Sequence, residues 1–151
     1  MTAPQPLTGY AIARRNMTAA LKTAVISTAK EEDRLQQAVL DLLKAAHRPG
    51  VVWWHVPNGG KRGKAEAARF KRLGVLAGVA DLNISLPGGR MCFMELKARK
   101  GRVSEEQEAF LAGMELNGHA TAVCRNVDEA KSALAKWGAI RGGAVVVEVV
   151  E

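Results

Sequence analysis

Cysteine is scarce in this sequence of 151 residues, which contains only Cys92 and Cys124. Both lie in apolar runs typical of strands, with no Cys-x-x-Cys motif and no histidine at zinc-ligand spacing. This pattern argues against a structural zinc site or a disulfide framework. It predicts two reduced thiols inside the core.

Long hydrophobic runs are also missing. The longest apolar stretches, such as residues 144–147, fall far short of the roughly 20 residues that a helix needs to cross a bilayer. The N-terminus has no apolar segment followed by a secretion cleavage site. We therefore expect no membrane association and a single globular domain, because 151 residues with 48% hydrophobic content suffice for one core and not for two.

Acidic residues are absent from the beginning of the chain, where the first is Glu31. We interpret residues 1–29 as an N-terminal arm, in which residues 18–29 could form a helix. The main domain is expected over residues 30–138. Residues 139–151 form a C-terminal tail that could add a strand.

Hydrophobic spacing and turn residues predict an α/β protein with a mixed β-sheet flanked by helices. A β-hairpin is expected around residues 87–89 because two apolar runs flank Pro-Gly-Gly. Ser104 and Gln107 match a capping box, while Asn126 and Asp128 are alternative N-caps of the last helix. The expected elements, in order, are a helix from Glu31 to a stop at Pro49-Gly50, a strand over 51–56, a helix over 64–73, strands over 81–86 and 90–97, a helix after Ser104, a strand over 120–125 and a helix over 128–137.

Basic residues outnumber acidic ones, 22 to 15, for a net charge of +7. A polyanion is therefore a natural partner. The alternative, that these charges form an ordinary solvated surface, stays open for either cluster alone. The first cluster comprises Lys61, Arg62, Lys64, Arg69, Lys71 and Arg72, and the second comprises Lys97, Arg99, Lys100 and Arg102.

Two carboxylates are expected to meet across the hairpin. If the turn is centred on Gly88, residues whose numbers add up to 176 lie opposite each other, and Asp81 and Glu95 are such a pair. Like charges this close repel unless a cation separates them. Lys97 follows Glu95 on the same strand face. Two acids and an amine suit phosphodiester hydrolysis with a hard cation such as Mg²⁺, in which the lysine orients water or stabilises charge on phosphorus.

The alternative is that Glu95 and Lys97 form an ordinary exposed pair at a strand end. Both strand faces, however, are apolar until that end: Met91 and Phe93 precede Glu95 on one face, while Cys92 and Met94 lie on the other. Charges that terminate a buried strand favour a functional site at the edge of the sheet.

Three segments together resemble the VRR-NUC family of the PD-(D/E)XK nuclease superfamily. They are Gly78-Val-Ala-Asp-Leu82, Phe93-Met-Glu-Leu-Lys97 and Gly101-Arg-Val-Ser-Glu-Glu-Gln107. The likeness extends over about residues 31–137. Ala80 departs from the family, which usually has proline before the aspartate, but this position supplies no ligand.

The resemblance implies a restriction-endonuclease-like fold, dependence on Mg²⁺ or Mn²⁺, and cleavage of DNA. The family has an acidic residue in its first helix, and Glu32 matches it. The adjacent Glu31 is the competing choice, although an acid near a helix N-terminus is favourable without any catalysis. The capping box alone could explain Gln107. The implied metal ligands are Asp81, Glu95, the carbonyl of Leu96 and Glu32, and the implied catalytic residues are Asp81, Glu95, Lys97, Glu32 and Gln107.

The resemblance is to stand-alone members of the family, of bacterial or phage origin. It implies a homodimer that acts on branched DNA such as Holliday junctions. We accordingly expect a homodimer in the cytoplasm of a bacterium or a phage-infected cell. Two alternatives remain, a non-cleaving nucleic-acid-binding protein and a restriction-type endonuclease that reads a linear sequence. The residues expected to contact DNA are Asn58, Lys61, Arg62, Lys64, Arg72, Arg99 and Lys100.

Overall fold

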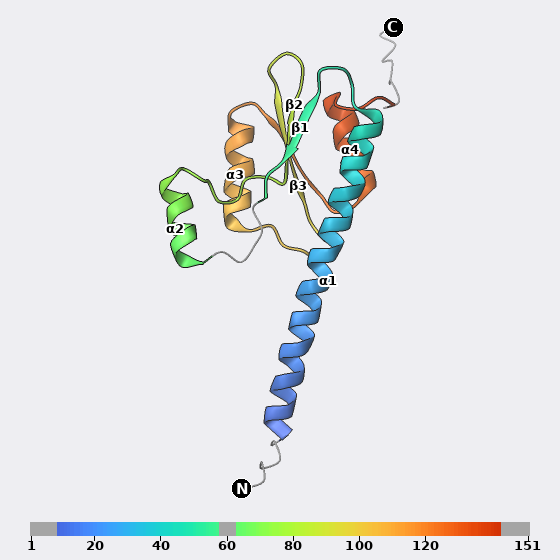
Figure 1. Cartoon of the computed structure of the whole chain (residues 1–151). Helices are drawn as coiled ribbons and strands as arrows, with labels where there is room; N and C mark the ends of the chain where they lie inside the picture. The colour runs from blue at the N-terminus through green and yellow to red at the C-terminus, as the bar shows by residue number, and fades with distance from the viewer. Residues whose placement is uncertain (1–8, 58–62, 143–151) are drawn as a thin grey trace.

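The computed structural model describes residues 9–57 and 63–142, with side chains from residue 21 onward. It is an α/β structure in which helices flank a mixed sheet, and its element order agrees with the sequence prediction (Figure 1). The elements are α1 (Gly9–Ala46), β1 (Val52–His55), α2 (Lys64–Arg72), β2 (Leu82–Ser85), β3 (Met91–Leu96), α3 (Glu105–Leu116), β4 (Ala120–Cys124) and α4 (Val127–Trp137).

The sheet has the strand order β1-β2-β3-β4, in which β3 and β4 are parallel and the other neighbours are antiparallel. In the β2–β3 hairpin, Leu82 lies opposite Met94, which confirms the predicted register. The Leu86 N–H donates to the Arg90 carbonyl at 2.9 Å and closes the turn. Gly88, with φ of +92°, adopts the left-handed conformation that this short connection requires. The same register directs Asp81 towards Glu95 immediately beyond the last paired residues.

Two hydrophobic clusters lie on the two faces of the sheet. Met94 and the other even-numbered residues of β3 pack with α1 and α4 in the main core. Phe93, on the opposite face, packs with Leu111 of α3. The predicted alternation of β3 is therefore confirmed. Cys92 and Cys124 are free and buried, and burial raises the pKa of the Cys124 thiol to about 11.

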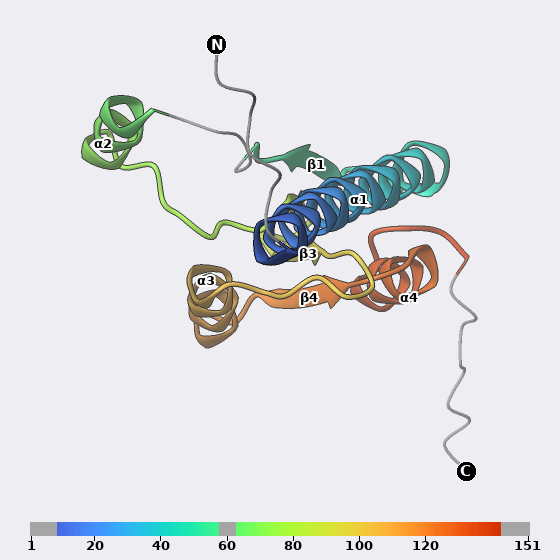
Figure 2. The same cartoon turned by 90° about the horizontal axis from the view of Figure 1, so that it is seen from below.

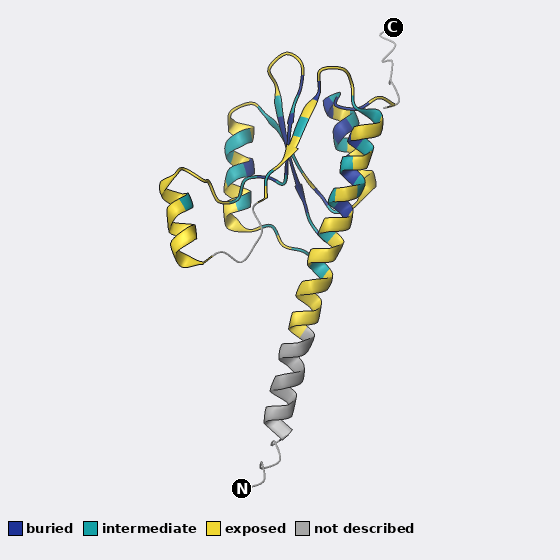
Figure 3. Ribbon diagram, viewed as in Figure 1, coloured by how far each residue is buried: buried dark blue, intermediate teal, exposed yellow. Residues whose placement is uncertain are grey.

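Helix α1 begins at Gly9 rather than at Glu31, so it runs without a break through the predicted boundary between arm and domain. Its C-terminal half packs into the core through residues such as Val39 and Leu43, whereas Leu21 is 61% exposed (Figure 3). The change in composition marks the point where the helix meets the domain. It does not interrupt the helix, because no proline or glycine separates residues 10 and 48.

The first residues after α4 also belong to the core. Ala139 and Ile140 are buried, and Ile140 forms an isolated antiparallel bridge with His47. The additional strand predicted for the C-terminal tail falls on residues 143–151, which lie outside the described part of the chain.

Side chains cap the last two helices as predicted. Ser104 and Gln107 form the complete capping box of α3. Asn126, rather than Asp128, caps α4 and accepts the Glu129 N–H at 2.8 Å. Within the described ranges, no helix combines the length and the hydrophobicity of a membrane span.

Gly78, in the segment between α2 and β2, packs against the N-terminus of α3. It has a φ of +81°, and a Cβ at this position would overlap the main-chain carbonyl of Glu106. We expect Gly78→Ala to lower the free energy of unfolding by about 3 kcal/mol, from left-handed strain plus the overlap. Gly118→Ala is the matched control, because Gly118 has a φ of +83° and a Cβ added there would meet no atom within 4 Å. Urea unfolding of both variants tests this expectation, and equal losses of stability would contradict it.

Candidate active site

Asp81 lies at the entry to β2, immediately after the buried residue Ala80. Its Oδ2 accepts a hydrogen bond from the N–H of Leu96 at 2.9 Å. Its main-chain carbonyl accepts the Val56 N–H at 3.0 Å. These bonds connect the aspartate to the end of β3 and to the residue that follows β1, so three parts of the sheet determine its position.

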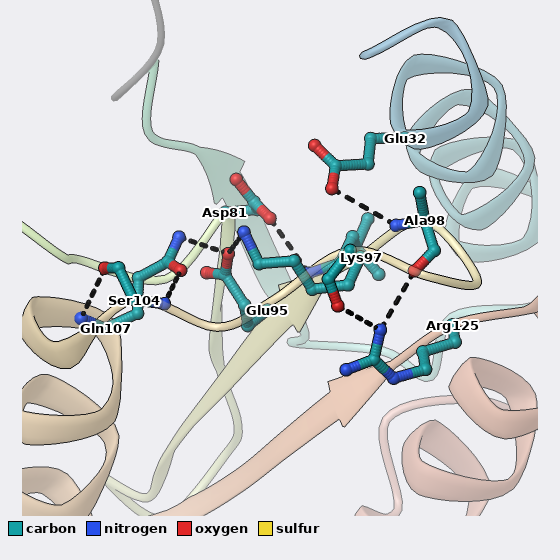
Figure 4. A network of polar contacts seen from close by, with 10 residues as sticks. Glu32, Asp81, Glu95, Lys97, Ala98, Ser104, Gln107 and Arg125 are labelled. Carbon is teal, nitrogen blue, oxygen red and sulfur yellow. Dashed lines mark hydrogen bonds and ion pairs between the residues drawn. The ribbon is translucent and has the colours of Figure 1, made fainter. Parts of the chain in front are cut away.

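Glu95 is a charged residue in a buried place. Its side chain is 1% exposed, and its Oε1 receives both Lys97 Nζ at 3.1 Å and Gln107 Nε2 at 2.5 Å (Figure 4). Its Oε2 is buried and has no hydrogen-bond partner among the described residues. Burial and the nearby Asp81 carboxylate together raise the pKa of Glu95 to about 7, against the opposing effect of Lys97. A further positive charge close to Glu95 would stabilise its ionised form and lower its pKa.

Gln107 has two roles at once. Its Oε1 accepts the Ser104 N–H at 2.9 Å, which completes the capping box. Its Nε2 donates to Glu95. The capping explanation and the site explanation of this residue are therefore compatible, because the two ends of one amide serve them separately.

The two glutamates of α1 bind the chain just beyond Lys97. Glu32 Oε1 accepts the Ala98 N–H at 3.1 Å, and Glu31 Oε1 accepts the Arg99 N–H at 3.2 Å. Figure 4 shows the Glu32 carboxylate directed at this turn. Among the described residues, no three acidic, histidine or cysteine side chains are close enough to hold a metal together. The metal-ligand role of Glu32 therefore stays a prediction.

Two polar residues near the site were not singled out in the sequence. Arg125 directly follows β4, and its Nη1 donates to the carbonyls of Ala98 at 2.9 Å and Gly101 at 2.6 Å. Asn83 is 6% exposed, and its register partner is Phe93, on the face that carries Glu95. Sequence patterns that could have identified them are the position of Arg125 directly after a strand and that of the Asn83 amide inside an apolar run.

The predicted DNA contacts fall in three places. Arg99 and Lys100 are exposed in the turn after Lys97. Lys64 and Arg72 lie on α2, which stands apart from the sheet in both Figure 1 and Figure 2. The remaining predicted contacts, Asn58, Lys61 and Arg62, lie outside the described residues.

The convergence of these groups defines what the site can do. Two carboxylates and one amine meet at the end of β3, and one oxygen of Glu95 has no hydrogen-bond partner in the described part of the chain. Carboxylate and carbonyl oxygens are suitable ligands for Mg²⁺ or Mn²⁺. A cation bound here, beside an amine that is 12% exposed, would attract a phosphate group to the same point.

Comparisons with known proteins identify the family to which this chain is similar. The VRR-NUC domain model matches residues 30–128. A solved structure described as a VRR_NUC domain protein is 25% identical, with a TM-score of 0.58, and the match covers 70% of this chain and 86% of that one. Another, described as a VRR_NUC domain, is 18% identical with a TM-score of 0.48, over 70% and 95% of the two chains. No curated protein matches the sequence.

Proposed function

The chain belongs to the VRR-NUC domain family, a family of nucleases, and from that premise we propose that it is a metal-dependent DNA endonuclease that prefers branched DNA. The single observation that carries this proposal is the buried Glu95 carboxylate. One of its oxygens is shared by Lys97 and Gln107, and the other has no partner in the described chain. A protein rarely leaves a buried carboxylate oxygen unsatisfied without a functional reason.

The residues at this point fit a Mg²⁺ or Mn²⁺ ion. Asp81, Glu95 and the carbonyl of Leu96 would hold it, since all three offer oxygen ligands from adjacent strand ends. When bound, the ion supplies Lewis acidity towards a phosphate oxygen and lowers the pKa of coordinated water. The raised pKa of Glu95 supports this assignment, because a cation would relieve the repulsion that Asp81 contributes.

The protein's own groups perform the remaining tasks. Lys97 holds a positive charge beside Glu95, where it can orient a water molecule or stabilise charge that develops on the phosphate. Gln107 fixes the carboxylate of Glu95 from α3. Glu32 and Arg125 hold the turn after Lys97, through its N–H and carbonyl groups respectively. In this proposal Glu32 is a candidate further ligand, because only its Oε1 is engaged by the Ala98 N–H.

The charge distribution supports DNA as the substrate. Arg99 and Lys100 border the carboxylates, and α2 adds further cations at some distance from the sheet. Phosphate contacts of this kind provide affinity without reading sequence. We further propose that the protein acts as a homodimer, since two active sites related by a two-fold axis would suit paired nicks on a symmetric four-way junction.

The test is incubation of the purified full-length chain with labelled four-way junction, flap and linear duplex DNA of shared sequence. We expect cleavage with Mg²⁺ or Mn²⁺, none with EDTA, and faster cleavage of the branched substrates. Native mass measurement should give twice the chain mass.

Other outcomes would favour the alternatives. Binding of all three substrates without cleavage in either metal would indicate a non-cleaving nucleic-acid-binding protein. Cleavage that ignores branching and is confined to one short sequence would indicate a restriction-type enzyme.

A further inference from the structure

The turn that follows α2 carries an exposed apolar patch, formed by Leu73, Val75 and Leu76. Their side chains are 67%, 49% and 59% exposed. Three large apolar side chains within four residues, all facing water, call for an explanation, because soluble proteins normally scatter such groups singly. We name them the Leu73–Leu76 patch.

The patch is held by a defined helix-termination motif. The N–H of Val75 donates to the Phe70 carbonyl at 2.9 Å, and the N–H of Gly74 donates to the Lys71 carbonyl at 3.2 Å. Gly74 has a φ of +86°. This bonding pattern is the Schellman motif, which fixes the chain that leaves the helix. The apolar side chains are therefore presented on a preorganised turn, beside an open groove between α2 and Glu106.

Cations lie on the α2 side of the patch, and one acid, Glu106, lines the groove beside it. Arg69, Lys71 and Arg72 occupy the last turn of α2, whose only acid is Glu66. All of these side chains are exposed (Figure 3). A second copy of this chain docked on the patch would bring like charges together, whereas a nucleic acid offers phosphates to the cations and apolar base faces to the leucines. Charge complementarity thus favours DNA as the occupant.

A short connection links the patch to the active site. The chain runs from Leu76 through Gly78 and the buried Ala80 to Asp81. Five residues span at most about 18 Å when extended. Gly78 packs against the main chain of Glu106 and Gln107, and Gln107 in turn contacts Glu95. The patch therefore lies at a limited distance from the candidate catalytic carboxylates.

We propose that the Leu73–Leu76 patch is a wedge that inserts beside unstacked bases at a DNA branch point. This inference rests on the proposed function and identifies the part of the protein that selects branched DNA. Apolar side chains are used in this way to separate base steps. Unstacking is costly in intact duplex and much cheaper at a branch, so the wedge discriminates between the two. Because the reach is about 18 Å, cleavage falls within about five nucleotides of the branch.

The test uses a four-way junction that carries 2-aminopurine at the branch point, with EDTA present so that cleavage does not enter. Wild-type protein should increase the fluorescence of 2-aminopurine, which is quenched by stacking. The Leu73→Ala/Leu76→Ala double variant should lose most of this increase. Leu116→Ala is the matched control, because Leu116 is 89% exposed on α3 and should leave the increase unchanged.

A second readout is the ratio of binding affinities for junction and duplex DNA. We expect the double variant to lower this ratio about tenfold, an effect within the range expected when one or two leucine side chains are no longer buried against bases. If wild-type protein fails to cleave but the double variant alone loses the fluorescence increase, the wedge stands and the nuclease proposal fails.

Three results would overturn the wedge. They are an equal fluorescence increase in the double variant and the wild-type protein, no increase with the wild-type protein, and conversion of a native dimer to a monomer by the double substitution. The last result would instead assign the patch to an interface between two copies.

Discussion

Lys97→Met is expected to lower the rate of DNA cleavage about 10³-fold, the loss typical for removal of a catalytic proton donor or charge-stabilising group. The lysine side chain is 12% exposed, and its amine is 3.1 Å from Glu95 Oε1. Methionine keeps much of the apolar stem and removes the charge. The defect should appear in single-turnover cleavage with saturating protein and metal, because the substitution affects the chemical step more than binding.

The pH dependence of this variant should change as well. Lys97 lowers the pKa of Glu95, which burial and Asp81 raise to about 7. Without the amine, Glu95 of the metal-free protein should hold its proton to higher pH. The proton then competes with the metal up to a higher pH, so the rising limb of the pH–rate profile measured at subsaturating metal shifts upward. Lys44→Met provides the matched control, because Lys44 is 64% exposed on α1. Cleavage within about threefold of wild type in Lys97→Met would remove the lysine from the mechanism.

The positions of Asp81 and Glu95 relative to each other could be predicted, because the turn of a hairpin determines which residues of its two strands face each other. Once Gly88 marked the turn, strand pairing followed residue by residue, and the observed pair Leu82–Met94 has the expected register. Asp81 and Glu95 are the next residues of the same series. Alternation along β3 likewise predicted which of its side chains share a face, although not that α1 and α4 cover one face and α3 the other.

Other features depend on contacts between distant parts of the chain. Glu31 and Glu32 could not be separated in the sequence, and in the structure both accept N–H groups from the turn after Lys97. Arg125 joins that turn to β4 through carbonyls that no sequence pattern marks as acceptors. The beginning of α1 was misplaced because acids and apolar spacing indicate where a helix packs, whereas helix propensity determines how far it extends.

Glu95→Gln is expected to stabilise the metal-free protein at pH 8 while it abolishes cleavage. The folded protein raises the pKa of Glu95 from 4.5 to about 7. The native state therefore binds more protons than the unfolded state between these values, and stability falls as the pH rises through this window. At pH 8 the ionised Glu95 carboxylate destabilises the fold by at most about 3 kcal/mol. Glu95→Gln recovers only part of this free energy, because the substitution also removes the ion pair with Lys97.

Thermal unfolding in EDTA measures this effect. A gain of 2–3 kcal/mol corresponds to a rise of roughly 5–10 °C in Tm at pH 8, and the difference should disappear below about pH 4.5, where wild-type Glu95 is protonated in both states. Added Mg²⁺ should raise the Tm of the wild-type protein and leave that of Glu95→Gln nearly unchanged. Glu108→Gln, an exposed glutamate on α3, should change stability by less than about 0.5 kcal/mol at either pH.

A wild-type protein as stable as Glu95→Gln at pH 8 would contradict this account, because the buried charge would then carry no cost. The opposite result would connect stability with function at one residue. A carboxylate that destabilises the metal-free fold, and is relieved by a divalent cation, is retained for the cation and not for the fold. Gain of stability, loss of cleavage and loss of the Mg²⁺-dependent rise in Tm in the same variant would together identify Glu95 as a metal ligand independently of any sequence resemblance.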